Sequence, residues 1–131
     1  MTILYRDQRQ RTRVAAVEFD FSDVPNGVFV PLVELPNSSI ITAATLHVLT
    51  ASNAGTSHVL DIGTAAAPTQ LVNDANAAVA ARVALTPANV VYSGVNRIGV
   101  TSAIVGGAPT AGRFVLFVEY VILGSSDFTQ G

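Results

Sequence analysis

The sequence contains no cysteine, no tryptophan and no lysine. Without cysteine the chain can form neither disulfides nor thiolate metal sites. Long hydrophobic runs are also missing: the longest candidate, residues 114–123, is broken by Glu119, whereas a membrane-spanning helix needs about 20 apolar residues. The N-terminus carries Arg6, Asp7 and Arg9, where a signal peptide would have an apolar stretch. We therefore expect neither a membrane anchor nor a secretion signal.

Charge is scarce as well, and apolar residues take its place. Charged side chains make up 12% of the chain, against about 25% in a typical soluble domain. Hydrophobic residues reach 50%, and the mean hydropathy is +0.47. A chain of 131 residues is expected to form one domain that buries roughly two-thirds of its unfolded surface. So much apolar character predicts that another protein surface covers part of the folded domain.

The few basic residues are concentrated at the N-terminus. All seven are arginine, and four of them fall in the first thirteen positions: Arg6, Arg9, Arg11 and Arg13. Because only Asp7 opposes them, residues 1–13 carry a net charge of +3, whereas three arginines against eight acidic residues give residues 14–131 a net charge of −5. Such asymmetry predicts a basic arm that binds an acidic partner surface.

Three interpretations of this arm remain open. It is a solvated chain end, an arm that docks on another protein, or a contact for nucleic acid. Nucleic acid is the least favoured, because it calls for a denser basic patch with interleaved aromatic residues, and Tyr5 is the only aromatic residue of the arm. We expect a protein-docking arm and no direct contact with nucleic acid.

Most of the remaining chain shows the period-two alternation of half-buried strands. The pattern predicts a weak strand around residues 90–92 and clear strands over residues 14–21, 28–35, 40–50, 57–63, 97–105 and 113–123. Turn residues predict that the first two strands fold back on each other, that residues 51–56 form a hairpin connection, and that the glycine-rich residues 106–112 join the last two strands as a hairpin. Pro31 cannot donate to a ladder and marks its strand as an edge strand or a bulge.

Between Pro68 and Arg82 the period changes. Apolar residues recur at the i, i+4, i+7 and i+8 spacing of an amphipathic helix: Leu71, Val72, Ala75, Ala78 and Val79. We therefore predict one short helix within a mainly β fold, a two-layer antiparallel β-sandwich that is jelly-roll-like. The sandwich domain would span residues 14–123, between the basic N-terminal arm (1–13) and a short C-terminal tail (124–131).

The last strand is apolar on both of its faces. Phe114, Leu116 and Val118 alternate with Val115 and Phe117. Such two-sided apolarity predicts that both faces are covered, either by the second sheet and the helix or by another protein chain.

Candidate metal ligands are few. His47 and His58 lie in predicted strands on either side of a turn. Asp61 is the only nearby third ligand, and the spacing matches no zinc motif. We expect ordinary strand histidines and no metal site.

Candidate catalytic carboxylates are equally sparse. Glu18 and Asp20 lie on one face of a strand about 7 Å apart, a separation similar to that of a glycosidase pair, but the alternation of the strand assigns them to solvent. Asp20, Asp23 and Asn26 place oxygen atoms in the first turn, yet they are too few and wrongly spaced for an EF-hand calcium site. No nucleophile elbow precedes a helix, and Gly106-Gly107 is followed by neither a helix nor a lysine. We expect no enzymatic activity and no cofactor.

Three stretches of the sequence resemble the small jelly-roll structural proteins of tailed-bacteriophage heads, which include the cement, or decoration, proteins. They are residues 33–41 (VELPNSSII), which lead into a long strand, residues 50–56 (TASNAGT) followed by residues 60–63 (LDIG), and residues 106–120 (GGAPTAGRFVLFVEY). The similarity covers about residues 28–123, as a pattern of strands and turns.

The resemblance implies a non-enzymatic virion protein that docks on the outside of the capsid as a dimer or trimer and ties neighbouring subunits of the major capsid protein together. The arginine arm would then reach an adjacent subunit, where guanidinium groups pair bidentately with carboxylates. The alternative is a tail-associated or receptor-binding β-sandwich that recognises host-surface carbohydrate. It is less favoured because sugar sites usually present exposed aromatic rings, and the chain has no tryptophan and three tyrosines.

Overall fold

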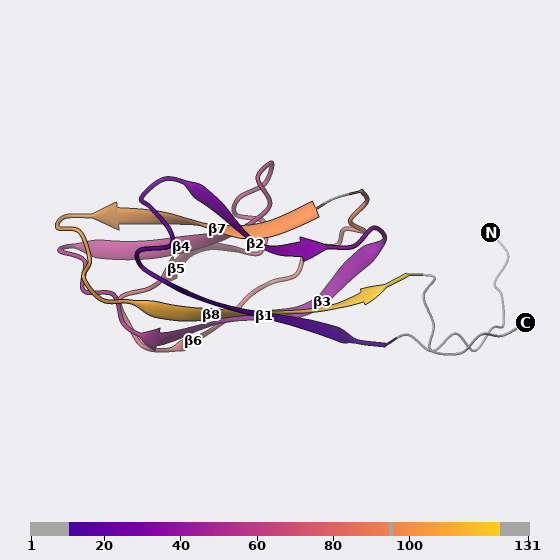
Figure 1. Cartoon of the computed structure of the whole chain (residues 1–131), viewed down its shortest axis with the longest axis horizontal. Helices are drawn as coiled ribbons and strands as arrows, with labels where there is room; N and C mark the ends of the chain where they lie inside the picture. Colours follow the sequence, from indigo (N-terminus) through magenta and orange to yellow (C-terminus); the bar gives the residue numbers. More distant parts are fainter. Residues whose placement is uncertain (1–10, 95, 124–131) are drawn as a thin grey trace, which may run out of the picture.

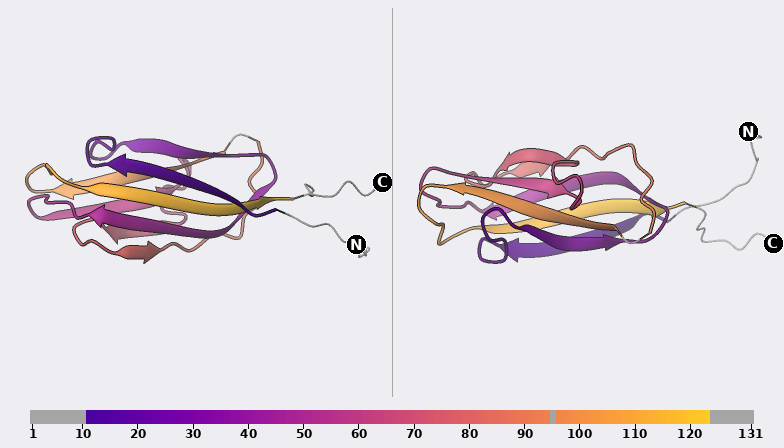
Figure 2. Two further views of the ribbon diagram at one scale, coloured as in Figure 1. Left: turned by 60° about the horizontal axis from the view of Figure 1, so that its bottom comes forward. Right: turned by 90° about the horizontal axis from the view of Figure 1, so that it is seen from above.

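The computed structural model describes residues 11–94 and 96–123. These residues form eight strands, which pack as two layers (Figures 1 and 2). The strands are β1 (Arg13–Asp20), β2 (Phe29–Leu35), β3 (Ser39–Thr50), β4 (Ser57–Gly63), β5 (Val72–Asn76), β6 (Arg82–Ala84), β7 (Asn96–Val105) and β8 (Arg113–Ile122).

The strand order is that of a jelly roll. The first sheet has the order β1-β8-β3-β6 and the second sheet the order β2-β7-β4-β5, and the strand pairs within both sheets are antiparallel. Only β4 and β5 are neighbours both in sequence and in a sheet, so every other connection carries the chain from one sheet to the other. Two four-stranded sheets joined in this way form the eight-stranded jelly roll, as the sequence predicted.

The core lies between the two sheets and follows the alternation of the sequence. The first sheet contributes Leu46, Phe114 and Leu116, and the second contributes Leu60 and Ile98, all at most 1% exposed. Each such side chain stabilises the fold by about 1.5–3 kcal/mol relative to an exposed one. The inner face of β8 is therefore covered by the second sheet, as predicted.

The strands predicted from alternation are confirmed to within a residue or two at their ends. Pro31 was predicted to mark either an edge strand or a bulge, and both are found. It lies in β2, an edge strand of the second sheet, and the register of β2 against β7 shifts between Pro31 and Val33. Of the weak strand predicted around residues 90–92, only Tyr92 pairs, in an isolated bridge with Ser39.

The predicted helix over residues 68–82 is wrong. This segment contains β5 and the start of β6, and none of the described residues belongs to a helix that could cross a membrane. Ala75 and Ala77 are buried while Asn76 between them is exposed, which is the period of a strand. Asp74 adopts a φ of 60° near a register shift of β4 against β5, and this bulge makes the apolar spacing resemble that of a helix.

The three predicted hairpins are also wrong. β1 pairs with β8 and β2 with β7, β3 and β4 lie in different sheets, and so do β7 and β8. Turn residues show where the chain reverses, but two stacked sheets lie only about 10 Å apart. A glycine-rich turn can therefore reach the other sheet as readily as the adjacent strand.

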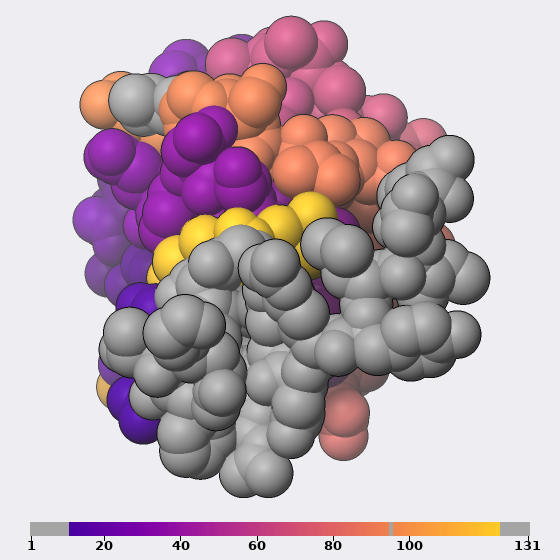
Figure 3. All heavy atoms as spheres, turned by 90° about the vertical axis from the view of Figure 1, so that its right-hand side faces the viewer, coloured from indigo at the N-terminus to yellow at the C-terminus, as the bar shows by residue number. Residues whose placement is uncertain are grey.

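The chain enters and leaves the sandwich at the same end. Arg13, the first residue of β1, lies opposite Tyr120 near the end of β8, and Figure 1 shows both strand ends on the same side. Figure 3 views this end, where the last described residues of β8 (yellow) lie beside the turn that joins β2 to β3 (purple). There the N–H of Leu123 donates to the carbonyl of Ser38 at 2.9 Å.

Candidate docking surfaces

The predicted arginine arm extends from the start of β1. Arg11 and Arg13 are exposed, and Arg13 is already the first residue of the strand. Arg6 and Arg9 lie outside the described residues. The structure thus places Arg11 and Arg13 at one end of the first sheet, and the role of the arm in docking stays a prediction.

The outer face of the first sheet carries an apolar patch next to charged side chains, because the register also places Glu18, Arg113 and Glu119 on this face. We call this face the β1–β8 face and define it by the outward side chains of Val14, Ala16, Ala43, Thr45 and Phe117, which lie opposite or diagonal to one another in the register. Val14 is 62% exposed and Phe117 is 37% exposed. A shallow hollow of about 260 Å³ beside Phe117 is bordered by the charged side chains of Arg82 and Glu119. Among the described residues, no element covers the outer face of β8, so its predicted cover by another protein chain stays a prediction.

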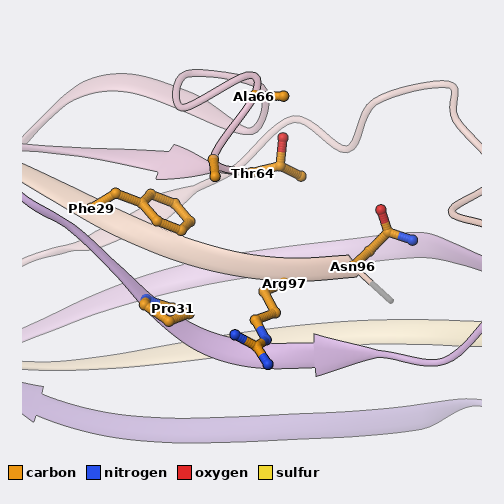
Figure 4. A pocket seen from close by; sticks show the side chains of 7 residues that line it. Phe29, Pro31, Thr64, Ala66, Asn96 and Arg97 are labelled. Atoms are coloured by element: carbon orange, nitrogen blue, oxygen red, sulfur yellow. The ribbon is translucent and has the colours of Figure 1, made fainter. Parts of the chain in front are cut away.

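A larger hollow, of about 560 Å³, lies on the outer side of the second sheet. Figure 4 shows Thr64 and Ala66 on one side of β7 and Pro31 on the other, with the ring of Phe29 lying over β7 and Arg97 beside it. The guanidinium of Arg97 lies 3.9 Å from the carboxylate of Glu34.

Sequence reasoning missed this second hollow. Its lining comes from β2, from the loop after β4 and from β7. One sequence signal was present: Gly99 leaves room beneath the Phe29 ring, because a Cβ there would lie 2.6 Å from a ring atom.

The three candidate metal ligands face different directions. His47 lies on the outer face of the first sheet with its ring edge-on to Phe117 at 5.1 Å. His58 is 1% exposed in the core. Asp61 faces the outer side of the second sheet, and its carboxylate accepts the N–H of Asp74 at 2.7 Å.

The environment of His58 favours a neutral ring. Its Nδ1 lies 2.7 Å from the hydroxyl oxygen of Ser52, its Nε2 has no partner among the described residues, and its ring lies edge-on to Phe114. Burial lowers the pKa of His58 below its ordinary value, because the apolar core disfavours the charged form. This histidine is therefore a core residue.

Glu18 and Asp20 share one face of β1, as predicted, but each has its own partner. Glu18 forms an ion pair with Arg113. Asp20 accepts hydrogen bonds from the hydroxyl of Ser22 at 2.5 Å and from its N–H at 2.8 Å, and these bonds lower the pKa of Asp20. A glycosidase acid needs a raised pKa, so Asp20 does not suit that role, and Glu18 is held by Arg113.

The three oxygen donors proposed for calcium do not converge. Asp23 accepts the N–H of Asp20 at 2.9 Å, and the side-chain amide of Asn26 bonds the backbone of Ile104. Across residues 11–94 and 96–123, no group of three or more histidine or acidic side chains could hold a metal ion. The site candidates that remain are surfaces for macromolecular contact.

No protein-family model matches the chain, and no curated protein sequence matches it. Chains of three phage capsids share its fold. A chain of the cyanophage Pam1 capsid asymmetric unit aligns with a TM-score of 0.66 and 16% identity, over 93% of this chain and 92% of its own length. A chain of the Ralstonia phage GP4 capsid aligns with a TM-score of 0.66 and 20% identity, over 95% of this chain and 92% of its own. A chain of the acid-stable capsid of the Helicobacter pylori bacteriophage KHP30 aligns with a TM-score of 0.64 and 21% identity, over 85% and 87%. The resemblance to small jelly-roll proteins of phage heads is thus confirmed at the level of the fold.

Proposed function

We propose that this protein is a structural protein of a tailed-bacteriophage head, and specifically a cement or decoration protein that docks on the outer surface of the capsid and stabilises contacts between major capsid subunits. The observation that carries the proposal is the likeness to chains of three phage capsids, over 85–95% of this chain and 87–92% of theirs. The matched chains are therefore small proteins built almost entirely from this one domain, as expected for an accessory subunit.

The exposed apolar surface supports docking on another protein. Val14 and Phe117 share the β1–β8 face, and a contiguous apolar face on a soluble domain usually marks an interaction site. Arg82 and Glu119 line the hollow beside Phe117, and Glu119 lies between Val14 and Ala43 in the register, so the face offers a partner both apolar and charged contacts. The arginine arm leaves from the same sheet and would extend the contact to an acidic surface of a neighbouring subunit.

The mechanism is mechanical and cumulative rather than catalytic. Each docked copy contributes only the surplus of its interface burial over the cost of ordering the contact. Many copies on one shell, each bridging two subunits, raise the work needed to separate those subunits. Modest individual contacts are then enough, and the function requires neither a cofactor nor an active site.

A truncation tests the role of the arm. Deletion of residues 1–12 removes Arg6, Arg9 and Arg11 but keeps Arg13, which pairs with Tyr120 in the sandwich. We expect the truncated domain to fold and to co-sediment with heads at least about tenfold more weakly, as expected for the loss of charge-assisted contacts. Unchanged co-sedimentation would remove the arm from the docking surface.

The location on the particle tests the function itself. Electron microscopy of the phage that encodes the protein should show a regular lattice of jelly-roll density on the outside of the head. Density at the tail alone would contradict the cement function and favour the alternative, a receptor-binding module. The hollow at Phe29, Thr64, Asn96 and Arg97 gives that alternative a specific site, since it combines an aromatic ring with hydrogen-bonding groups, and binding on a glycan array would support it.

A further inference from the structure

Three of the four sheet edges carry known defences against pairing with another chain. β2 contains Pro31 and a register shift, β5 has five residues with Asp74 in a left-handed conformation, and β6 has only three residues. Proline, bulges and short length are the devices by which natural sheets prevent edge-to-edge association.

The fourth edge, β1, has none of these defences. It pairs with β8 without interruption from Arg13–Tyr120 to Asp20–Arg113, and it contains neither proline nor glycine. Figure 2 (left) shows β1 along one margin of the first sheet. A long, regular and partly apolar edge would promote aggregation unless something pairs with it.

The hydrogen-bonding groups on this edge belong to alternate residues. The N–H of Phe21 donates to the carbonyl of Gly112, in register with the β1–β8 ladder. In an antiparallel pair the bonded residues alternate, so Val14, Ala16 and Glu18 direct their N–H and C=O groups away from β8. No described strand lies on that side of β1. Asp20 belongs to the same series, but the Asp23 carboxylate already accepts its N–H.

We propose that β1 pairs antiparallel with β1 of a second copy, about a two-fold axis at Ala16, and joins the two first sheets into one eight-stranded sheet. In this register Ala16 lies opposite Ala16 of the second copy, and Val14 lies opposite Glu18. The N–H and C=O groups of Val14, Ala16 and Glu18 would then all be hydrogen-bonded to the opposite residue of the second copy. The outer sides of the two first sheets then lie on the same side of the joined sheet, and the two β1–β8 faces adjoin across a seam that also carries Glu18.

The charges along β1 favour this antiparallel self-pairing. Arg11 and Arg13 lie at its N-terminal end, and Asp20 and Asp23 lie at or just beyond its C-terminal end. Antiparallel pairing sets the basic end of one copy beside the acidic end of the other, at both ends of the seam, whereas parallel pairing would set like charges together. The two Ala16 side chains at the axis stand side by side on the outer face without crowding, and the isologous contact is closed and limited to two copies.

A single cysteine tests the register directly, because the chain has no cysteine of its own. Opposed residues of a hydrogen-bonded pair have Cα atoms about 5.5 Å apart, within the range of about 4.4–6.8 Å that a disulfide spans. Under mild oxidation we expect Ala16→Cys to form a covalent dimer of twice the 13.6 kDa chain mass. Ala43→Cys and Ala103→Cys, which also replace exposed alanines, are the matched controls. If Ala16→Cys cross-links no faster than they do, the proposed register is wrong.

A lysine variant tests whether the edge drives association. In sedimentation velocity with the full chain and no capsid, Ala16→Lys should raise the dissociation constant of the dimer at least about tenfold, because an edge lysine blocks strand pairing. Ala103→Lys should leave it unchanged, and circular dichroism should show both variants folded. A wild-type chain that is monomeric at all concentrations would overturn the proposal.

The result is independent of the proposed function, since no capsid enters this measurement. If Ala16→Lys weakens co-sedimentation with heads but not self-association, the lysine disturbs the outward β1–β8 face, to which Ala16 belongs, and self-pairing through β1 is excluded. If it weakens self-association alone, the seam is confirmed whatever the dimer binds.

Discussion

The two sheets of this jelly roll have the same number of strands but present different surfaces. The second sheet has a proline and a register shift on β2, a bulge on β5, and part of its outer side bordered by the loop after β4. The first sheet has an apolar patch around Phe117 on its outer face and an undefended edge at β1, and its strands β1 and β8 are the first and the last of the described chain. The sandwich core needs both sheets equally, so the difference concerns contacts outside the domain, and it is the reason for which we propose the first sheet as the docking side.

Two phenylalanines of β8 give the sharpest break between core and docking face. Phe114 is 1% exposed and Phe117 is 37% exposed. Phe114→Ala should lower the free energy of unfolding by about 3–5 kcal/mol, because it leaves a cavity between the sheets. Phe117→Ser should lower it by only about 1–2 kcal/mol, because part of this side chain is already exposed, yet abolish co-sedimentation with heads. Urea unfolding and sedimentation measure the two effects, and a large loss of stability in Phe117→Ser would contradict the assignment of this face to docking.

A glycine in the second sheet tests how closely its outer side is packed. A Cβ at Gly99 would lie 2.4 Å from the carbonyl oxygen of Val30 and 2.6 Å from the ring of Phe29. Gly99→Ala should therefore lower the free energy of unfolding by about 1–3 kcal/mol, as overpacking does. Gly107→Ala is the control, since the nearest atom to its new Cβ is 4.0 Å away. Equal thermal shifts in the two variants would show that both the Phe29 ring and the backbone at Val30 move aside without cost.

The two histidines test the same contrast through pH. Burial lowers the pKa of His58 below the ordinary 6.5, so the unfolded chain binds a proton more readily than the folded one. Its contribution to stability is fully present above pH 6.5 and is lost as the pH falls from there toward the folded pKa, by at most about 1.4 kcal/mol per pH unit. The pH dependence of urea unfolding between neutrality and pH 5 should flatten in His58→Phe and persist in His47→Asn, in which the outward histidine is removed. A slope that survives in His58→Phe would point to another group.

Alternation predicted the strands of this fold well, because a strand that separates core from solvent has a period of two whichever sheet it joins. The same fact explains the failures. Nothing in the turns after β1, β3 and β7 distinguishes a hairpin from a crossing between sheets, and the partners of each strand are set by packing across the whole domain. The bulge at Asp74 shifted the apolar spacing of β5 toward that of a helix.

The docking surfaces were only partly accessible to sequence reasoning. The two-sided apolarity of β8 did point to an outer face that needs cover, and Phe117 lies on it. The hollow beside Phe29 could not be predicted, because three segments far apart in the sequence meet there. Arg6 and Arg9 lie outside the described residues, so the arm is still known from charge alone.

The adjacency of β1 and β8 at the end where the chain enters and leaves determines how the domain would respond to tension. A pull that separates the two chain ends would peel β1 from β8 one rung at a time and would need little force. A pull on the start of β1 against the loops at the far end would load every rung of the β1–β8 ladder in shear at once. A domain anchored through its N-terminal segment and held at its opposite end would therefore resist a high force, whereas one held by both termini would unfold at a low force.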